Sequence, residues 1–132
     1  MNEYGEKAAN FSKQGFNCSQ SVLGALSDFT GLDDCTAKAI SSGFGGGVRC
    51  GEVCGAVAGG AMALGAALGR DCDGSKTAKS ALAVNELTNS FNEKYGCLRC
   101  ADLIADAGKS KCVEFMSYCA IKCAEILKEN NK

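Results

Sequence analysis

The feature that most restricts the fold of this chain is the run 53–69, which contains no charged residue and consists mainly of alanine and glycine. Its length is near the lower limit for crossing a bilayer. Alanine and glycine gain little from hydrocarbon, however, and Gly51, Gly55 and Gly59 recur at intervals of four. This spacing places a smooth ridge on one side of a helix, which allows close packing of a neighbouring helix. The run therefore predicts a buried central helix and not a membrane span.

The remaining sequence predicts further helices around this one. Proline is absent, while alanine, leucine, lysine and glutamate are plentiful, a balance that favours helix. Apolar residues at helical spacing, with caps and stop signals, indicate helices over 2–14, 17–31, 33–42, 101–105, a segment ending at Tyr95 and a segment after Gly108. We expect an all-α single domain, residues 1–132, forming a compact bundle of about five to seven helices around the buried Gly/Ala-rich helix.

Charge and the first residues of the chain limit its partners and location. Lys and Arg number 14 against 15 for Asp and Glu, with the signs interspersed, which argues against nucleic acid or an anionic membrane surface as a partner. The opening residues show no export signal, so a cytoplasmic protein is expected. In that compartment the ten cysteines are kept reduced, which favours metal ligands, redox thiols or buried packing over structural disulfides.

Histidine is absent from the chain, which narrows the chemistry that the cysteines can serve. A mixed cysteine–histidine zinc site, a histidine-ligated haem and an imidazole base are all excluded. Thiolate ligation and thiol exchange remain. Thiolates are suited to iron–sulfur clusters, zinc and copper(I).

Two cysteines lie at the start of the predicted central helix. Cys54 is expected about one turn inside it, where free backbone N–H groups and the helix dipole stabilise a thiolate or an anionic cluster. Cys50 precedes it by four residues and is expected on the same helix face, with Gly51 and Gly55 leaving space beside the sulfurs for an inorganic group. The preceding glycines, 43–47, predict a tight turn whose backbone approaches a neighbour closely.

Two further groups of cysteines carry potential chemistry. Cys97 and Cys100 form a CxxC pair, which can chelate one metal ion or close into a disulfide, with Arg99 between them favouring thiolates. Cys112 follows Lys109 and Lys111 at the start of the last predicted helix, a position that should lower the pKa of its thiol.

The other cysteines are interpreted as packing residues, because cysteine is among the residue types most often buried. Cys35 and Cys72 have no neighbouring ligand at chelating spacing, and we expect them to be small buried hydrophobes. Cys119 and Cys123 fall on the apolar stripe of the last helix, where packing is favoured over ligation.

Five segments together resemble the C_GCAxxG_C_C family of small, cysteine-rich, redox-active proteins. They are GFNCSQSVL (15–23), SGFGGG (42–47), GEVCGAVAGGAMALG (51–65), YGCLRCADLIA (95–105) and CVEFM (112–116), and they cover nearly the whole chain. The central motif reads here as Cys-Gly-Ala-x-x-Gly. The family's defining cysteines match Cys18, Cys54, Cys100 and Cys112, and its motif glycines match Gly55 and Gly59.

The resemblance implies a small helical protein that binds an iron–sulfur cluster or another prosthetic group. Its implied partner is an unidentified redox protein or a transporter-associated oxidoreductase. The four matched cysteines lie at or near the starts of separate predicted helices, whose N–H groups are suited to an anionic cluster. The leading hypothesis is therefore electron transfer by an iron–sulfur cluster on these four thiolates, with Cys50 and Cys97 as reserve ligands. The backbone around the cofactor would come from five glycines, Gly45, Gly46, Gly47, Gly55 and Gly59.

Three alternatives remain open from the sequence. A thiol–disulfide oxidoreductase or redox sensor would use Cys97 with Cys100, or Cys50 with Cys54. A structural zinc module would use four cysteine ligands. A binding module without metal would use the cysteines only for packing. The glycine ridge meets a helix either of the same chain or of a second copy, so a homodimer also stays open.

Overall fold

The structure, a computed structural model, describes residues 2–69 and 79–130. Cys72, which we expect to be a small buried hydrophobe, lies outside these ranges. Within them the chain forms eight α-helices and three short helical turns, with one isolated bridge in place of any strand, so the all-α prediction is confirmed. The helices are α1 (Glu3–Lys13), α2 (Cys18–Ala25), α3 (Ser27–Thr30), α4 (Asp34–Ser41), α5 (Gly55–Leu68), α6 (Lys79–Tyr95), α7 (Cys100–Ala107) and α8 (Cys112–Asn130). The short turns are η1 (Ser42–Phe44), η2 (Gly47–Gly51) and η3 (Lys109–Lys111).

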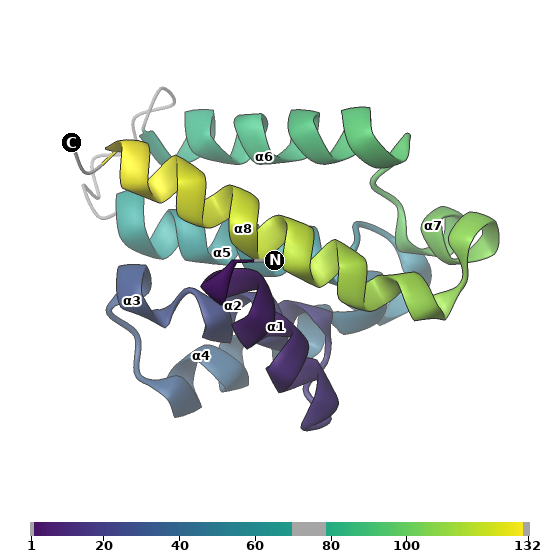
Figure 1. Cartoon of the computed structure of the whole chain (residues 1–132), viewed down its shortest axis with the longest axis horizontal. Helices are drawn as coiled ribbons and strands as arrows, with labels where there is room; N and C mark the ends of the chain where they lie inside the picture. Colours follow the sequence, from purple (N-terminus) through teal and green to yellow (C-terminus); the bar gives the residue numbers. More distant parts are fainter. Residues whose placement is uncertain (1, 70–78, 131–132) are drawn as a thin grey trace.

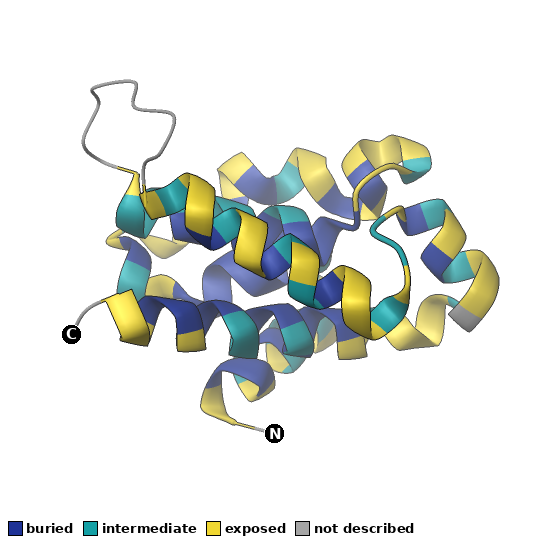
Figure 2. Ribbon diagram, turned by 90° about the horizontal axis from the view of Figure 1, so that it is seen from above, coloured by how far each residue is buried: buried dark blue, intermediate teal, exposed yellow. Residues whose placement is uncertain are grey.

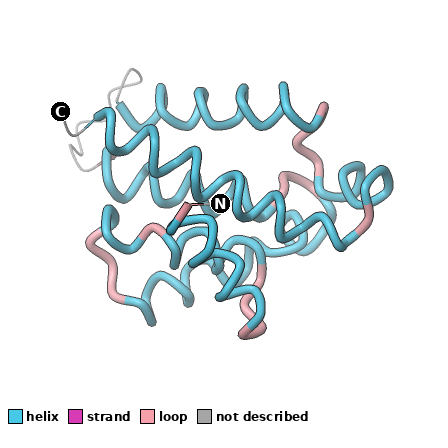
Figure 3. Tube along the Cα trace, viewed as in Figure 1, coloured by secondary structure: helices cyan, strands magenta, loops and turns pink. Residues whose placement is uncertain are grey.

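Helix α5 is the centre of the bundle, as the uncharged run predicts. It packs against α2, α6 and α8, with α1 and α4 outside α2 (Figure 1). The buried residues of the bundle face this centre, while α6 and α8 present exposed residues outward (Figure 2). Short loops join most of the described helices (Figure 3). No helix among the described residues combines the length and apolar character needed to cross a membrane.

The glycines of α5 allow α2 to lie directly against it. A Cβ atom added at Gly59 would be 2.5 Å from the backbone oxygen of Ser19, and one at Gly55 would be 3.0 Å from the Cβ of Cys18. The ridge predicted from the sequence therefore packs against a helix of the same chain. Gly51 differs from this prediction, because it lies outside α5 and faces Ala101.

The helix predicted over 17–31 is instead divided into α2 and α3. Leu26, between them, has φ −100° and ψ 18°, and its N–H bonds to the carbonyl of Leu23, which tightens the last turn of α2. Leu26 is fully buried, and α3 then packs against α5. The apolar spacing agrees with helical structure on both sides of Leu26, and the change of direction follows from the packing of α3 against α5.

Candidate thiol site

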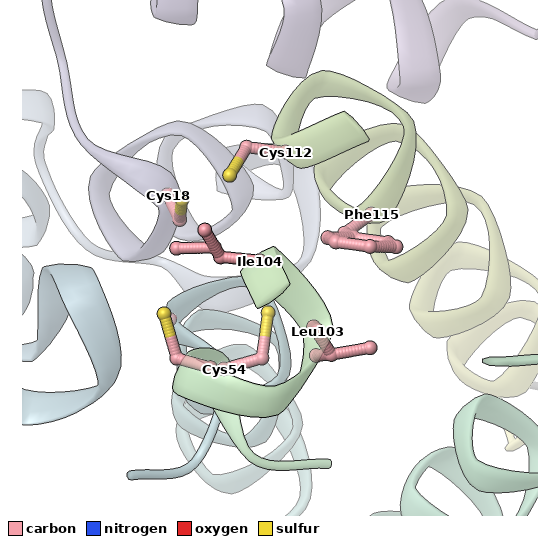
Figure 4. A pocket seen from close by; sticks show the side chains of 8 residues that line it. Cys18, Cys54, Leu103, Ile104, Cys112 and Phe115 are labelled. Carbon is pink, nitrogen blue, oxygen red and sulfur yellow. The ribbon is translucent and has the colours of Figure 1, made fainter. Parts of the chain in front are cut away.

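Four cysteine thiols line one small cavity, beside α7 (Figure 4). Its volume is about 10 Å³, enough for roughly one water molecule. Apolar side chains from α7 and α8 complete the wall. The lining residues are Cys18, Cys54, Gly55, Cys100, Leu103, Ile104, Cys112 and Phe115.

Cys18 is positioned by the capping box at the start of α2. The Asn17 side chain accepts from the N–H of Gln20, and the Gln20 side chain accepts from the N–H of Asn17, each at 3.0 Å. The Asn17 amide also donates to the carbonyl of Ser42 at 2.9 Å. Asn17 therefore fixes both the first turn of α2, which begins with Cys18, and the contact of that turn with η1.

We expect Asn17→Ala to lower the free energy of unfolding by about 1–2 kcal/mol and to speed alkylation of Cys18 by iodoacetamide. Asn2→Ala is the matched control, because Asn2 caps α1 by accepting from the N–H groups of Tyr4 and Gly5. It should lose about 1 kcal/mol and leave the alkylation rate unchanged. Urea unfolding in reductant and mass-spectrometric alkylation rates measure both effects. Equal alkylation of Cys18 in the two variants would contradict this role of Asn17.

Cys54 and Cys100 are held together by backbone pairing between two distant segments. The N–H of Cys54 donates to the carbonyl of Leu98 at 2.8 Å, and the N–H of Cys100 donates to the carbonyl of Glu52 at 2.5 Å. Gly47 packs against the same pairing, since a Cβ there would be 2.5 Å from the nitrogen of Glu52 and 2.8 Å from the Cβ of Cys100. The sequence predicts that the glycine segment 43–47 approaches a neighbour closely. In the structure the neighbours of Gly47 are the backbone of Glu52 and the Cβ of Cys100.

The central helix begins later than the sequence suggests, which changes the positions of both cysteines near its start. Val48 and Arg49 have φ of 58° and 63°, in the left-handed region that a right-handed helix cannot contain. Helix α5 therefore starts at Gly55, and Cys54 is its N-cap residue. Cys50 lies exposed in η2 and its thiol donates to the carbonyl of Gly47 at 3.5 Å. The expectation that Cys50 and Cys54 share a helix face is wrong.

All four cavity cysteines lie at helix starts. Cys18, Cys100 and Cys112 are the first residues of α2, α7 and α8, and Cys54 caps α5. Helix starts carry backbone N–H groups that have no partner within the helix. The cavity therefore joins four sulfur atoms with the positive ends of four helix dipoles.

Burial, and not the helix dipole, has the largest effect on the pKa values of Cys18, Cys54 and Cys100. Burial raises the pKa of Cys18 to about 12, and the neighbouring Cys112 and Cys54 sulfurs add to this effect. Burial also raises the pKa of Cys54 to about 11, although the N–H groups of Ala56 and Val57 act in the opposite direction. The pKa of Cys100 is raised by burial and by Cys112. The expected stabilisation of the Cys54 thiolate by the helix start is therefore outweighed, because the site is apolar and holds other sulfurs.

The remaining cysteines lie outside the cavity lining. Cys119 and Cys123 are fully buried in α8, in agreement with a packing role, and a Cβ added at Gly60 would be 2.8 Å from the Cys123 sulfur. Cys35 is exposed on α4, so its predicted burial is wrong, because it falls on the outer side of that helix. Cys97 is half-buried, and it does not line the cavity although its CxxC partner does.

Other residues proposed from the sequence also differ in their placement. Among the proposed glycines, only Gly55 lines the cavity, whereas Gly45, Gly46, Gly47 and Gly59 do not. Arg99 was expected to favour the thiolates of the CxxC pair. It instead forms ion pairs with Glu52 at 3.6 Å and with Asp102 at 3.2 Å. The apolar wall of Leu103, Ile104 and Phe115 was missed, although these residues lie three or four positions after Cys100 and Cys112, the spacing of one helix face.

The arrangement supplies a soft, sulfur-only donor set inside an apolar wall. In the described part of the chain, no set of three cysteine or carboxylate side chains already has the geometry to hold a metal ion. The four thiols therefore line one cavity, but their sulfur atoms are not arranged at ligand distances around a single point.

Comparison with known proteins assigns the chain to a family. No curated protein and no solved structure matches it. A family model described as "Putative redox-active protein (C_GCAxxG_C_C)" matches residues 16–129, which include all four cavity cysteines. Because the match spans most of the sequence, the chain belongs to the C_GCAxxG_C_C family.

Proposed function

We propose that this protein is an electron carrier that holds an iron–sulfur cluster on Cys18, Cys54, Cys100 and Cys112. The observation that carries the proposal is that four thiols from four helix starts line one small apolar cavity. The redox-active description of the family supports the same class of function. The electron partner proposed is a cytoplasmic redox protein or a transporter-associated oxidoreductase.

The chemistry of the donor set fits such a group. Thiolates are the usual ligands of iron–sulfur clusters, and helix-start N–H groups stabilise the negative charge of cluster and ligands. The N–H groups of Ala56 and Val57 act to lower the pKa of the Cys54 thiol, in the direction that favours a thiolate ligand. A bound cluster would supply one-electron transfer, and Leu103, Ile104 and Phe115 would surround it with apolar side chains. Because burial raises the pKa of Cys18, Cys54 and Cys100, cofactor binding must release their protons.

The size of the cavity adds a requirement, because a volume of about 10 Å³ accommodates roughly one water molecule and not a cluster. We propose that α7 moves outward to admit the cofactor. Helix α7 lies at one end of the bundle, beyond α6 and α8 (Figure 1). Gly96 and Gly108 flank its segment with φ of 85° and 82°, so the chain turns at both ends of the element that carries Cys100, Leu103 and Ile104.

We expect Ile104→Ala to accelerate cofactor incorporation several-fold, because the side chain occupies part of the cavity wall that must yield. Ile40→Ala is the matched control, since Ile40 is 51% exposed on α4 and does not line the cavity. The initial rate of visible absorbance during reconstitution with iron and sulfide measures the effect. Equal rates in the two variants would show that Ile104 does not limit entry.

Anaerobic reconstitution of the full chain tests the function directly. Reduced protein is incubated with ferrous iron and sulfide, desalted, and assayed for iron, acid-labile sulfide and visible charge-transfer absorption that bleaches on reduction with dithionite. Stoichiometric iron and sulfide with this absorption supports the proposal. Folded protein that retains neither one contradicts it, and tight zinc binding whose removal unfolds the chain would favour the structural zinc module.

The thiol–disulfide alternative through Cys97 and Cys100, or Cys50 and Cys54, is less favoured by the placement of the sulfurs. In each pair one cysteine lines the cavity and the other does not. Mapping of disulfides after mild oxidation separates this alternative from cofactor binding.

A further inference from the structure

We infer that Cys18 and Cys112 are a disulfide-forming pair, which hydroperoxides oxidise and which closes the thiol site when oxidised. These cysteines begin α2 and α8 and lie far apart in the sequence. Both thiols line the same cavity, and the Cys112 sulfur is close enough to the Cys18 thiol to add to the rise in its pKa. In Figure 4 their two sulfurs lie near one another on one side of the cavity, with Cys54 on the other side.

Cys18 and Cys112 are more accessible to an oxidant than the other two cavity thiols. Cys18 and Cys112 are half-buried, whereas Cys54 and Cys100 are only 4% and 9% exposed. A small hydroperoxide therefore meets Cys18 or Cys112 before the deeper sulfurs. Either thiol of the pair can react first, because both are half-buried.

The reaction is a two-electron oxidation in two steps. One of the two sulfurs attacks the terminal oxygen of the hydroperoxide, the O–O bond breaks, and the alkoxide or hydroxide leaves as alcohol or water with the proton of that thiol. The resulting sulfenic acid is attacked by the other sulfur, so that the S–S bond forms, the S–O bond breaks and water leaves with the proton of the second thiol. Two thiols lose two electrons and two protons, and the hydroperoxide is reduced to one alcohol or water molecule and one further water molecule.

The disulfide removes two of the four proposed ligands and ties the first turn of α2 to the first turn of α8. Oxidised protein then cannot bind the cofactor until a dithiol reductant reopens the pair. This consequence rests on the proposed function, whereas formation of the disulfide does not require any cofactor.

The test uses the reduced, metal-free full chain under nitrogen. Equimolar hydrogen peroxide is added, remaining thiols are trapped with N-ethylmaleimide, and linked peptides are identified by mass spectrometry. We expect a predominant Cys18–Cys112 linkage. Cys18→Ser should leave a sulfenic acid on Cys112 that dimedone labels, and Cys35→Ser, which alters an exposed cysteine outside the cavity, should form the linkage at the original rate.

A predominant linkage of Cys97 to Cys100, of Cys50 to Cys54 or of Cys54 to Cys100, or the absence of any disulfide, would overturn the inference. A second measurement follows iron and sulfide uptake by the oxidised protein, which should be lost and should return with dithiothreitol; uptake equal to that of reduced protein would overturn the closure of the site. Failure of the reduced protein to take up iron would refute the proposed cofactor, while the peptide linkage still decides the identity of the pair.

Discussion

Serine in place of Cys54 is expected to abolish stable cluster assembly in the reconstituted protein. Cys54 is only 4% exposed, its backbone is fixed by the bond to Leu98, and the N–H groups of Ala56 and Val57 act to lower the pKa of its thiol. A serine oxygen is a harder ligand than a thiolate and does not match the preference of iron–sulfur clusters for sulfur. Bound iron and sulfide per chain should therefore fall on the order of tenfold or more, since even changes around a ligand weaken metal sites by about 10–100-fold.

The matched control for this variant is Cys35→Ser, which makes the same atom exchange on the exposed surface of α4 and should retain full iron and sulfide. Cys97→Ser and Cys50→Ser test the two reserve ligands, and both should also assemble the cluster. Assembly in Cys54→Ser equal to that of the unaltered chain would exclude Cys54 as a ligand. Loss of assembly in Cys50→Ser or Cys97→Ser would replace the proposed ligand set, provided that circular dichroism shows an intact fold.

Features determined by neighbouring residues could be predicted from the sequence. The capping box of Asn17 and Gln20 is present as expected, because its partners lie three residues apart and depend little on the rest of the fold. The burial of α5 followed from the lack of charge between Val53 and Gly69. The motif resemblance and the helix-start positions together indicated the four cysteines that the structure places around one cavity.

Features that depend on contacts between distant segments could not be predicted in the same way. The left-handed φ of Val48 and Arg49 has no signal in these residue types, since a β-branched residue rarely adopts it. The turn is accompanied by pairing of Glu52 and Cys54 with Leu98 and Cys100. Thiol acidity also depends on tertiary structure, because desolvation in the assembled cavity exceeds the effect of a local helix start.

The packing of α2 on α5 leaves no room for an added side-chain atom at Gly59. A Cβ added at Gly59 would lie 2.5 Å from the oxygen and 2.9 Å from the Cα of Ser19. Both atoms belong to the backbone, so no side-chain rotation can relieve the clash and α2 must move. Overpacking of this kind costs about 1–3 kcal/mol, which exceeds the gain of about 0.5–1 kcal/mol that alanine brings to a helix interior.

Gly59→Ala should therefore lower the free energy of unfolding, whereas Gly65→Ala, the same change in the same helix, should raise it. A Cβ at Gly65 meets no atom within 4 Å, so only the helix propensity changes. Urea unfolding in reductant measures both variants, and equal shifts in the same direction would contradict the close contact of α2 with α5. Because Ser19 follows Cys18 directly, the displacement caused by Gly59→Ala also moves the Cys18 sulfur away from Cys54. Iron incorporation should then fall in Gly59→Ala and stay unchanged in Gly65→Ala, which links the glycine of the central helix to the geometry of the thiol site.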